Sequence, residues 1–182
     1  MSTLTVKELS APTGEVIKIA AGKTLDLNSQ GTLILPTVPS AKMPTGSVLQ
    51  VVNATNTNTA NGGFLHTTTS SSYSAVALSA AITPSSTSSK IMVFINTSYY
   101  RGGASSWTIY GGGANLGGST HGMLRVTGGE SYWYPISLST LHSPNTTSAI
   151  TYQLYSRAES GTTYTGGDGD VVSTITLMEI QG

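Results

Sequence analysis

The chain has 182 residues, of which only 9% are charged, and its formal net charge is zero. That length suits one ordinary domain with an appendage, whereas typical globular proteins carry roughly 25% charged residues. So little charge offers no electrostatic surface for DNA or RNA and nothing that would draw the chain to an anionic membrane. We therefore expect neither nucleic acid nor membrane as a partner. Hydroxyl groups take the place of charge, because the sequence contains 26 Ser and 28 Thr.

The sequence contains no cysteine, which excludes disulfides, thiolate metal sites and cysteine nucleophiles together. Stability must then come from packing or from the association of several copies. The first residues, MSTLTVKELS, hold no apolar stretch of signal-peptide length. The longest apolar run, residues 91–95, is far too short to span a bilayer. We therefore expect synthesis in a cytoplasm without use of the general secretion route.

Residues 1–46 contain a short repeat. The segments VIKI (16–19), TLDL (24–27) and TLIL (32–35) follow one another at a spacing of eight residues, and a glycine precedes each of them. Alternate residues of a strand share a face, so each segment predicts a short strand with one apolar face. The predicted apolar positions are Ile17, Ile19, Leu25, Leu27, Leu33 and Leu35.

A strand of this length cannot bury its apolar face alone, so the repeat needs neighbours to complete a core. Three copies wound about a common axis would supply them, which predicts a homotrimer with a fibre-like β-prism and the six apolar positions as its core. The alternative is a meander that covers one face of the following domain. Pro36, Pro39 and Pro44 then indicate a linker, which divides the chain into residues 1–46 and 47–182.

The second part, residues 47–182, is predicted to be all β. We expect strands at residues 47–53, 63–70, 73–82, 90–98, 105–110, 122–126, 131–137, 149–157 and 171–180. Turns rich in Gly, Ser, Thr and Asn separate these segments, and no window has the apolar period of a helix. This pattern is typical of a β-sandwich or jelly-roll-like head. The fold class predicted for the whole chain is therefore all-β.

No motif indicates catalysis or cofactor binding. The GKT sequence at residues 22–24 lacks the upstream glycine and the following helix of a phosphate-binding loop. The histidines lie far apart, although His66 on a threefold axis would supply three metal ligands from three copies. Asp168 and Asp170 offer two carboxylates, too few for calcium without further oxygens. We therefore predict no enzyme, no cofactor and no resident metal.

Four segments spread along the chain carry a resemblance. They are MSTLTVKELSAPTGEVIKIAAGKTLDL (1–27), ITPSSTSSKIMV (82–93), SPNTTSA (143–149) and STITLME (173–179). Their order and joint occurrence resemble small tail-fibre and virion structural proteins of marine bacteriophages, cyanophages among them. The resemblance implies a trimeric fibre that attaches to the particle by its N-terminal part and presents a β-rich head. It carries over no catalytic residues, and it leaves both tail and capsid open as the location.

Aromatic residues beside glycine-rich loops are the candidates for receptor contact. They are Trp107, Tyr110, Tyr132, Trp133 and Tyr134. An aromatic ring offers apolar area for stacking on a sugar, and Tyr and Trp add a polar group. Three adjacent aromatics in one strand must alternate between its faces, so some of these side chains are expected in the core. The remainder are interpreted as contacts for a host-surface glycan.

The leading hypothesis is a structural and adhesive virion protein that is assembled in the host cytoplasm and built into the particle. Leu4, Val6 and Leu9 would dock the start of the chain on other virion proteins of the tail or capsid. One alternative is a capsid decoration protein that coats or cements the shell. Another is a polysaccharide depolymerase, which would need paired carboxylates. The sequence has only eight acidic residues in all.

Overall fold

The computed structural model describes residues 42–57, 63–127, 132–167 and 171–182. The chain divides into two units, Met1–Thr37 and Val38–Gly182, and the first lies wholly outside the described residues. The predicted trimer core and virion anchor also lie outside them and stay predictions. These positions are Ile17, Ile19, Leu25, Leu27, Leu33 and Leu35 for the core, and Leu4, Val6 and Leu9 for the anchor.

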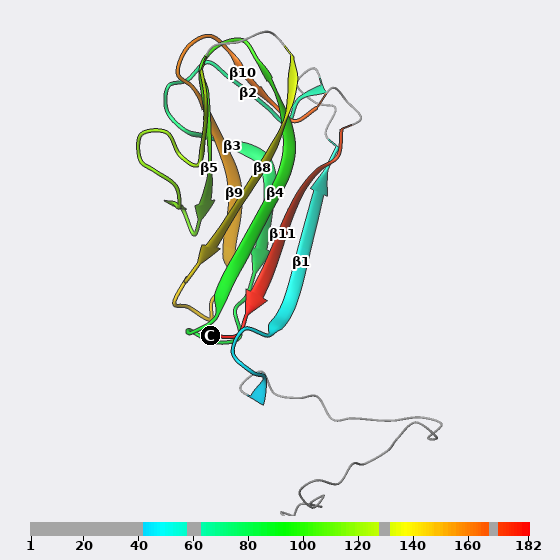
Figure 1. Ribbon diagram of the computed structural model, residues 1–182, viewed down its shortest axis with the longest axis vertical. Helices are drawn as coiled ribbons and strands as arrows, with labels where there is room; N and C mark the ends of the chain where they lie inside the picture. The colour runs from blue at the N-terminus through cyan, green and yellow to red at the C-terminus, as the bar shows by residue number, and fades with distance from the viewer. Residues whose placement is uncertain (1–41, 58–62, 128–131, 168–170) are drawn as a thin grey trace, which may run out of the picture. The chain divides into compact units, whose positions relative to one another are not determined.

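One antiparallel sheet has six strands. They are β1 (Val48–Asn56), β2 (His66–Thr68), β4 (Lys90–Arg101), β8 (Trp133–His142), β10 (Thr163–Thr165) and β11 (Ser173–Ile180). Along one edge β4 pairs with β11 and then with β10, and along its other edge it pairs with β8. β1 extends the sheet beyond β11, and β2 extends it beyond β10. As a result β1, β11, β4 and β8 run side by side (Figure 1).

The second antiparallel sheet has five strands and lies behind the first in Figure 1. Its members are β3 (Ser74–Ile82), β5 (Ser105–Gly111), β6 (Ala114–Asn115), β7 (Leu124–Val126) and β9 (Ile150–Ala158). β9 pairs with β3 on one side and with β5 on the other. The far edge of β5 pairs with the two short strands β6 and β7. This arrangement places β5 and β9 next to each other, which positions the groove described below.

The two sheets share one apolar core. β3 shows how the sequence builds it, because Val76, Leu78, Ala80 and Ile82 are buried while the residues between them are exposed. The whole cluster draws on both sheets and consists of Leu65, Val76, Leu78, Ala80, Ile82, Ile91, Val93, Ile95, Tyr99, Trp107, Ile109, Ile136, Leu138, Ile150, Tyr152, Leu154, Ile175 and Leu177. Successive side chains of a strand point to opposite faces, so each sheet turns one face to this core and the other outward.

The predicted all-β class is confirmed, with two antiparallel sheets in the described residues. Each predicted strand segment overlaps an observed strand, but the prediction missed β6 and β10, which have two and three residues. β6 forms a hairpin with β5 through Gly112 and Gly113, whose φ angles are 59° and 85°. Two consecutive positive φ angles are the requirement of a two-residue turn that suits twisted strands, and glycine meets it without strain.

Glu179 on β11 carries a completely buried carboxylate. Its Oε1 accepts hydrogen bonds from the backbone N–H and the hydroxyl of Ser85, both at 2.7 Å, and its Oε2 accepts one from Gln50 Nε2 at 2.6 Å. Burial alone would raise the pKa of this carboxyl, but hydrogen bonds from Ser89, Gln50 and Ser85 outweigh burial and lower it. The carboxylate thereby ties the turn between β3 and β4 to β1 and β11.

We expect Glu179→Ala to lower the free energy of unfolding by about 2–3 kcal/mol, because the donors of Ser85 and Gln50 lose their acceptor. Urea denaturation at neutral pH and equal protein concentration measures this difference. Thr174→Ala is the control, since Thr174 lies on the outward side of the same strand, and it should cost less than about 1 kcal/mol. Equal losses in the two variants would show that the buried carboxylate does not hold this turn.

Candidate ligand-binding groove

An open groove of about 590 Å³ lies over the outward face of the five-stranded sheet. β9 contributes Thr151, Gln153 and Tyr155, which alternate along the strand with the buried Tyr152 and Leu154. β9 also contributes Ile150 and β5 contributes Tyr110, while the turn after β5 and the segment before β9 contribute the other residues. The lining residues are Tyr110, Gly112, Gly113, Thr146, Ser148, Ala149, Ile150, Thr151, Gln153 and Tyr155. No charged side chain belongs to this described lining.

Two stacked tyrosines form the aromatic part of the groove. Tyr110 on β5 pairs in register with Gln153 on β9, so its diagonal neighbour on the same outward face is Tyr155. The ring centroids of the two tyrosines are 3.9 Å apart, and their planes meet at 22°. Both side chains are partly exposed. The pair therefore offers apolar ring area and two phenolic hydroxyls at one place.

Polar groups surround the tyrosine pair. Thr146 and Ser148 belong to the segment before β9, where the Thr146 hydroxyl accepts a hydrogen bond from the backbone N–H of Ser148 at 3.0 Å. Gln153 donates through Nε2 to the carbonyl of Val76 at 2.9 Å, which fixes the orientation of its amide. The backbone N–H of Gly112 donates to the carbonyl of Thr151 at 3.0 Å, so the glycine turn is held against β9. The groove thus combines rings, hydroxyls and an amide on a hydrogen-bonded frame.

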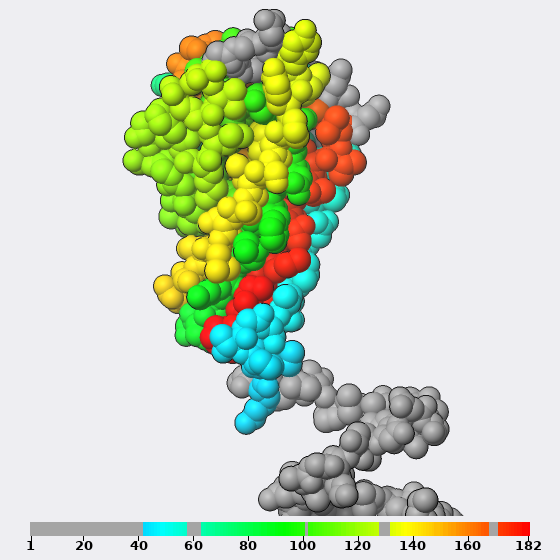
Figure 2. All heavy atoms as spheres, viewed as in Figure 1, coloured from blue at the N-terminus to red at the C-terminus, as the bar shows by residue number. Residues whose placement is uncertain are grey.

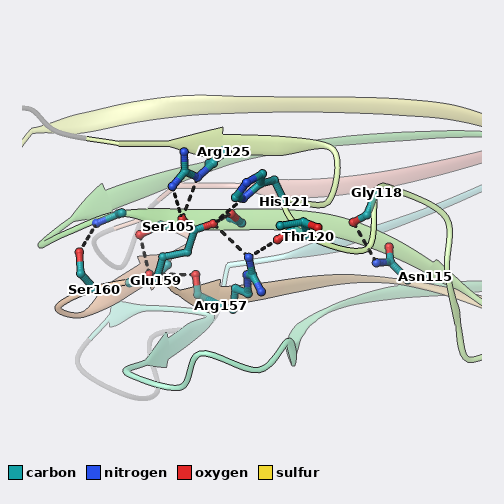
Figure 3. A network of polar contacts seen from close by, with 12 residues as sticks. Ser105, Asn115, Gly118, Thr120, His121, Arg125, Arg157, Glu159 and Ser160 are labelled. Carbon is teal, nitrogen blue, oxygen red and sulfur yellow. Dashed lines mark hydrogen bonds and ion pairs between the residues drawn. The ribbon is translucent and has the colours of Figure 1, made fainter.

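A charged cluster lies on the same sheet at the end of β9. Glu159 accepts hydrogen bonds from Arg125 Nε at 2.7 Å, from Ser106 Oγ at 2.6 Å and from Arg157 Nη2 at 3.1 Å. His121 Nδ1 lies 2.9 Å from the same carboxylate, and Figure 3 shows the two arginines and this histidine around Glu159. The hydrogen bonds from Arg125 and Ser106 are the main reasons why the pKa of Glu159 lies well below its ordinary value.

This cluster braces the aromatic part of the groove. Arg157 also donates to the backbone carbonyl of Thr120, which holds the loop between β6 and β7 against the sheet. Its guanidinium lies 5.0 Å from the ring centroid of Tyr73, and that ring lies 6.4 Å from the ring of Tyr110. A continuous series of contacts therefore runs from Glu159 through Arg157 and Tyr73 to the tyrosine pair.

The histidine considered as an axial metal ligand is occupied by hydrogen bonds. His66 contacts the hydroxyl of Ser156 through Nδ1 at 2.9 Å and the hydroxyl of Ser74 through Nε2 at 3.3 Å, and burial lowers its pKa. Among the described residues, no group of three or more potential metal ligands occurs. Asp168 and Asp170 lie outside the described residues.

The described part of the chain contains no helix long and apolar enough to cross a membrane.

The predicted receptor contacts are divided among separate places. Trp107 is completely buried in the core, where its Nε1 donates to Thr165 Oγ1 at 2.9 Å and its ring packs against Tyr99 at 4.5 Å. The prediction of a receptor contact for Trp107 is therefore wrong, because its position on β5 has inward parity. Tyr110 lies in the groove. The structure does not bring these residues together into one site.

The other three predicted contacts belong to the six-stranded sheet or its margin. Trp133 stacks on Phe64 with centroids 5.7 Å apart and lies 5.4 Å from Tyr100. Tyr134 has the opposite parity and stacks on Tyr99 at 5.4 Å, while Tyr132 just before β8 is 62% exposed. These side chains remain candidate contacts, and none of them lines the groove.

Sequence reasoning missed Tyr155 and its neighbours Thr151 and Gln153. Their signal was present in the strand ITYQLYSRA, where they occupy alternate positions between buried residues. The pairing of β9 with β5, which joins Tyr155 to Tyr110, could not be predicted from the sequence.

The geometry defines an all-β, two-sheet protein with an uncharged groove lined by tyrosine. No protein-family model matches the chain, and a search of curated proteins returned no match.

We expect Glu159→Gln to lower the free energy of unfolding at pH 7, because Arg125 and Arg157 lose an anionic partner. Folding lowers the pKa of this carboxyl, so its stabilising contribution is complete above its ordinary value of 4.5 and declines as the pH falls below that value. The difference between wild type and variant should therefore shrink toward acid pH. Urea denaturation over this pH range measures it, and a constant difference would contradict the assignment.

Proposed function

We propose that the chain is a bacteriophage virion protein, a short homotrimeric fibre or spike anchored by its N-terminal part. The β head would present binding surfaces to the host. The low charge, the hydroxyl-rich composition and the segments that resemble tail-fibre proteins support this proposal. The repeat of short apolar segments at residues 16–35, predicted to need neighbouring copies to complete a core, supports association of three copies.

The groove is the observation that carries the adhesive role. A neutral saccharide has apolar C–H faces that stack on aromatic rings and hydroxyls that exchange hydrogen bonds with hydroxyl and amide groups. Tyr110 and Tyr155 offer the rings, and Thr146, Ser148 and Gln153 offer the polar groups. An acidic saccharide would find no cation in the described lining. The groove therefore favours a neutral glycan of the host surface.

The same groove argues against hydrolysis of the bound sugar. Glycoside hydrolysis ordinarily needs two carboxyl groups on either side of the scissile bond, about 5–10 Å apart. The described lining contains no Asp or Glu. Binding without cleavage suits an adhesin whose weak single contacts are multiplied by the number of copies on a particle.

Tyr155→Ala should weaken binding of a neutral glycan by about tenfold, because it removes a stacking surface worth about 1.4 kcal/mol. The measurement is titration of purified protein with glycans that an array of neutral and acidic bacterial surface saccharides identifies. Tyr132→Ala is the matched variant, since Tyr132 is exposed and does not line the groove, and its affinity should equal that of wild type.

Two results would count against the groove. In the first, Tyr155→Ala binds the glycan as tightly as wild type while Tyr132→Ala loses affinity, which would assign recognition to the segment just before β8. In the second, the array shows binding to acidic saccharides alone, which an uncharged lining does not explain.

The proposed trimer makes a separate prediction about the N-terminal repeat. Burial of its Ile and Leu side chains would contribute on the order of 25 cal/mol per Å² of apolar area, and three carboxylates near one axis would oppose it. Leu25→Asp should therefore abolish the trimer that light scattering detects for wild type. Thr24→Asp, one residue earlier and of opposite parity, is the control and should remain trimeric. A stable trimer of Leu25→Asp would refute the axis assignment.

A further inference from the structure

The outward face of the six-stranded sheet carries an apolar row across four neighbouring strands. The strand register places Leu141 of β8 opposite Met92 of β4, Met92 opposite Met178 of β11, and Met178 opposite Val51 of β1. All four side chains have outward parity, since their strand neighbours Val93 and Leu177 belong to the core. Leu141 is 49% exposed and Val51 is 54% exposed. The row thus crosses the whole width of this part of the sheet.

Further apolar side chains border the row. Phe94 follows Met92 on the same outward side of β4. Ile180 pairs with Val48, which is 49% exposed. When one face of an antiparallel sheet packs on the core, its other face is normally polar, and large exposed apolar patches mark interaction surfaces. This face departs from that pattern, which indicates that something covers it.

The same face is almost free of charge. The outward positions of the four strands are Val51, Asn53 and Thr55 on β1, Thr174, Thr176, Met178 and Ile180 on β11, Lys90, Met92, Phe94, Asn96, Ser98 and Tyr100 on β4, and Trp133, Pro135, Ser137, Ser139 and Leu141 on β8. Lys90, the first residue of β4, is the one charged residue in this set. A surface that meets its own copy brings like groups together, so it must avoid unpaired charge at its centre.

The size of the face suits a stable interface. Four strands about 4.8 Å apart and the nine residues of β1 at about 3.3 Å each give roughly 19 by 30 Å, or about 570 Å² in plan. The accessible area of such a patch exceeds its plan area, so it approaches the roughly 800 Å² per partner of a standard interface. Figure 2 shows the four strands side by side at the surface, with no other described segment over them.

We infer that this face turns toward the same face of the other copies of this chain around a common axis, with Met92 and Met178 nearest that axis. The inference rests on the proposed homotrimer and deepens it, because it makes the head a second contact between copies besides the N-terminal repeat. β1, one of the four strands, follows that repeat after the proline-rich linker, so a trimer of the repeat would tether three heads and raise their local concentration. The groove lies on the opposite face and would remain open to ligand.

Single-cysteine cross-linking of the full chain tests this directly, since the natural sequence contains no cysteine. Met178→Cys places a thiol at the centre of the face. Ser79→Cys is the matched control, because Ser79 is exposed on the outward side of the other sheet. If three such faces surround one axis, the Met178 positions of different copies lie close to that axis and to one another. Ser79 belongs to the second sheet, about 10 Å further from the axis, so its positions in different copies stay far apart. A short bismaleimide is added to each variant, and products are separated by denaturing electrophoresis.

We expect Met178→Cys to give covalently linked copies in at least tenfold higher yield than Ser79→Cys, and Met92→Cys to behave like Met178→Cys. Equal, background yields in all three variants would overturn the inference. Sedimentation of the same samples separates the two proposals. A trimer without cross-links at Met178 or Met92 overturns the head contact and leaves the proposed trimer standing, whereas a monomer overturns both.

Discussion

The alternation of side chains along the strands is the constraint on which the rest of the structure depends. Because the two sheets share one core, the parity of each strand is fixed by its buried residues, such as Leu78 on β3 and Leu154 on β9. A shift of one residue in any of these strands would exchange its buried and outward sets. The alternation along β5 that places Trp107 in the core places Tyr110, at a position of opposite parity, in the groove. The outward surfaces are therefore consequences of how the core is packed.

Local pattern was sufficient to predict much of the fold. The longer strands can be predicted from alternating apolar and polar residues or from apolar runs, as in residues 74–82 and 90–98. The short strands β6 and β10 carry no such pattern and exist because longer neighbours pair with them. The site was harder to predict, because the contact between Tyr110 and Tyr155 depends on the pairing of β5 with β9. The Glu159 cluster likewise joins residues up to 53 positions apart, as in its bond with Ser106.

Charged residues are scarce, and both described acidic side chains, Glu159 and Glu179, hold a loop or turn in place. Glu179 holds the turn between β3 and β4 to the end of the six-stranded sheet, and Glu159 holds the loop between β6 and β7 near the groove. Elsewhere hydroxyls satisfy buried polar positions, as in the contact between Thr97 and Ser173 at 2.7 Å. Such a surface depends little on salt, because few of its interactions are between charges. That property suits the proposed location on a particle exposed to the medium.

The two outward faces have different proposed roles: copies of the chain meet through the six-stranded sheet, and ligand enters the groove on the five-stranded sheet. An electron cryomicroscopy reconstruction of the full-length protein tests this assignment most directly. We expect three heads that meet through the row from Leu141 to Val51, with every groove directed to solvent. Heads that stand apart, or that meet through the five-stranded sheet with Tyr110 and Tyr155 covered, would contradict the account.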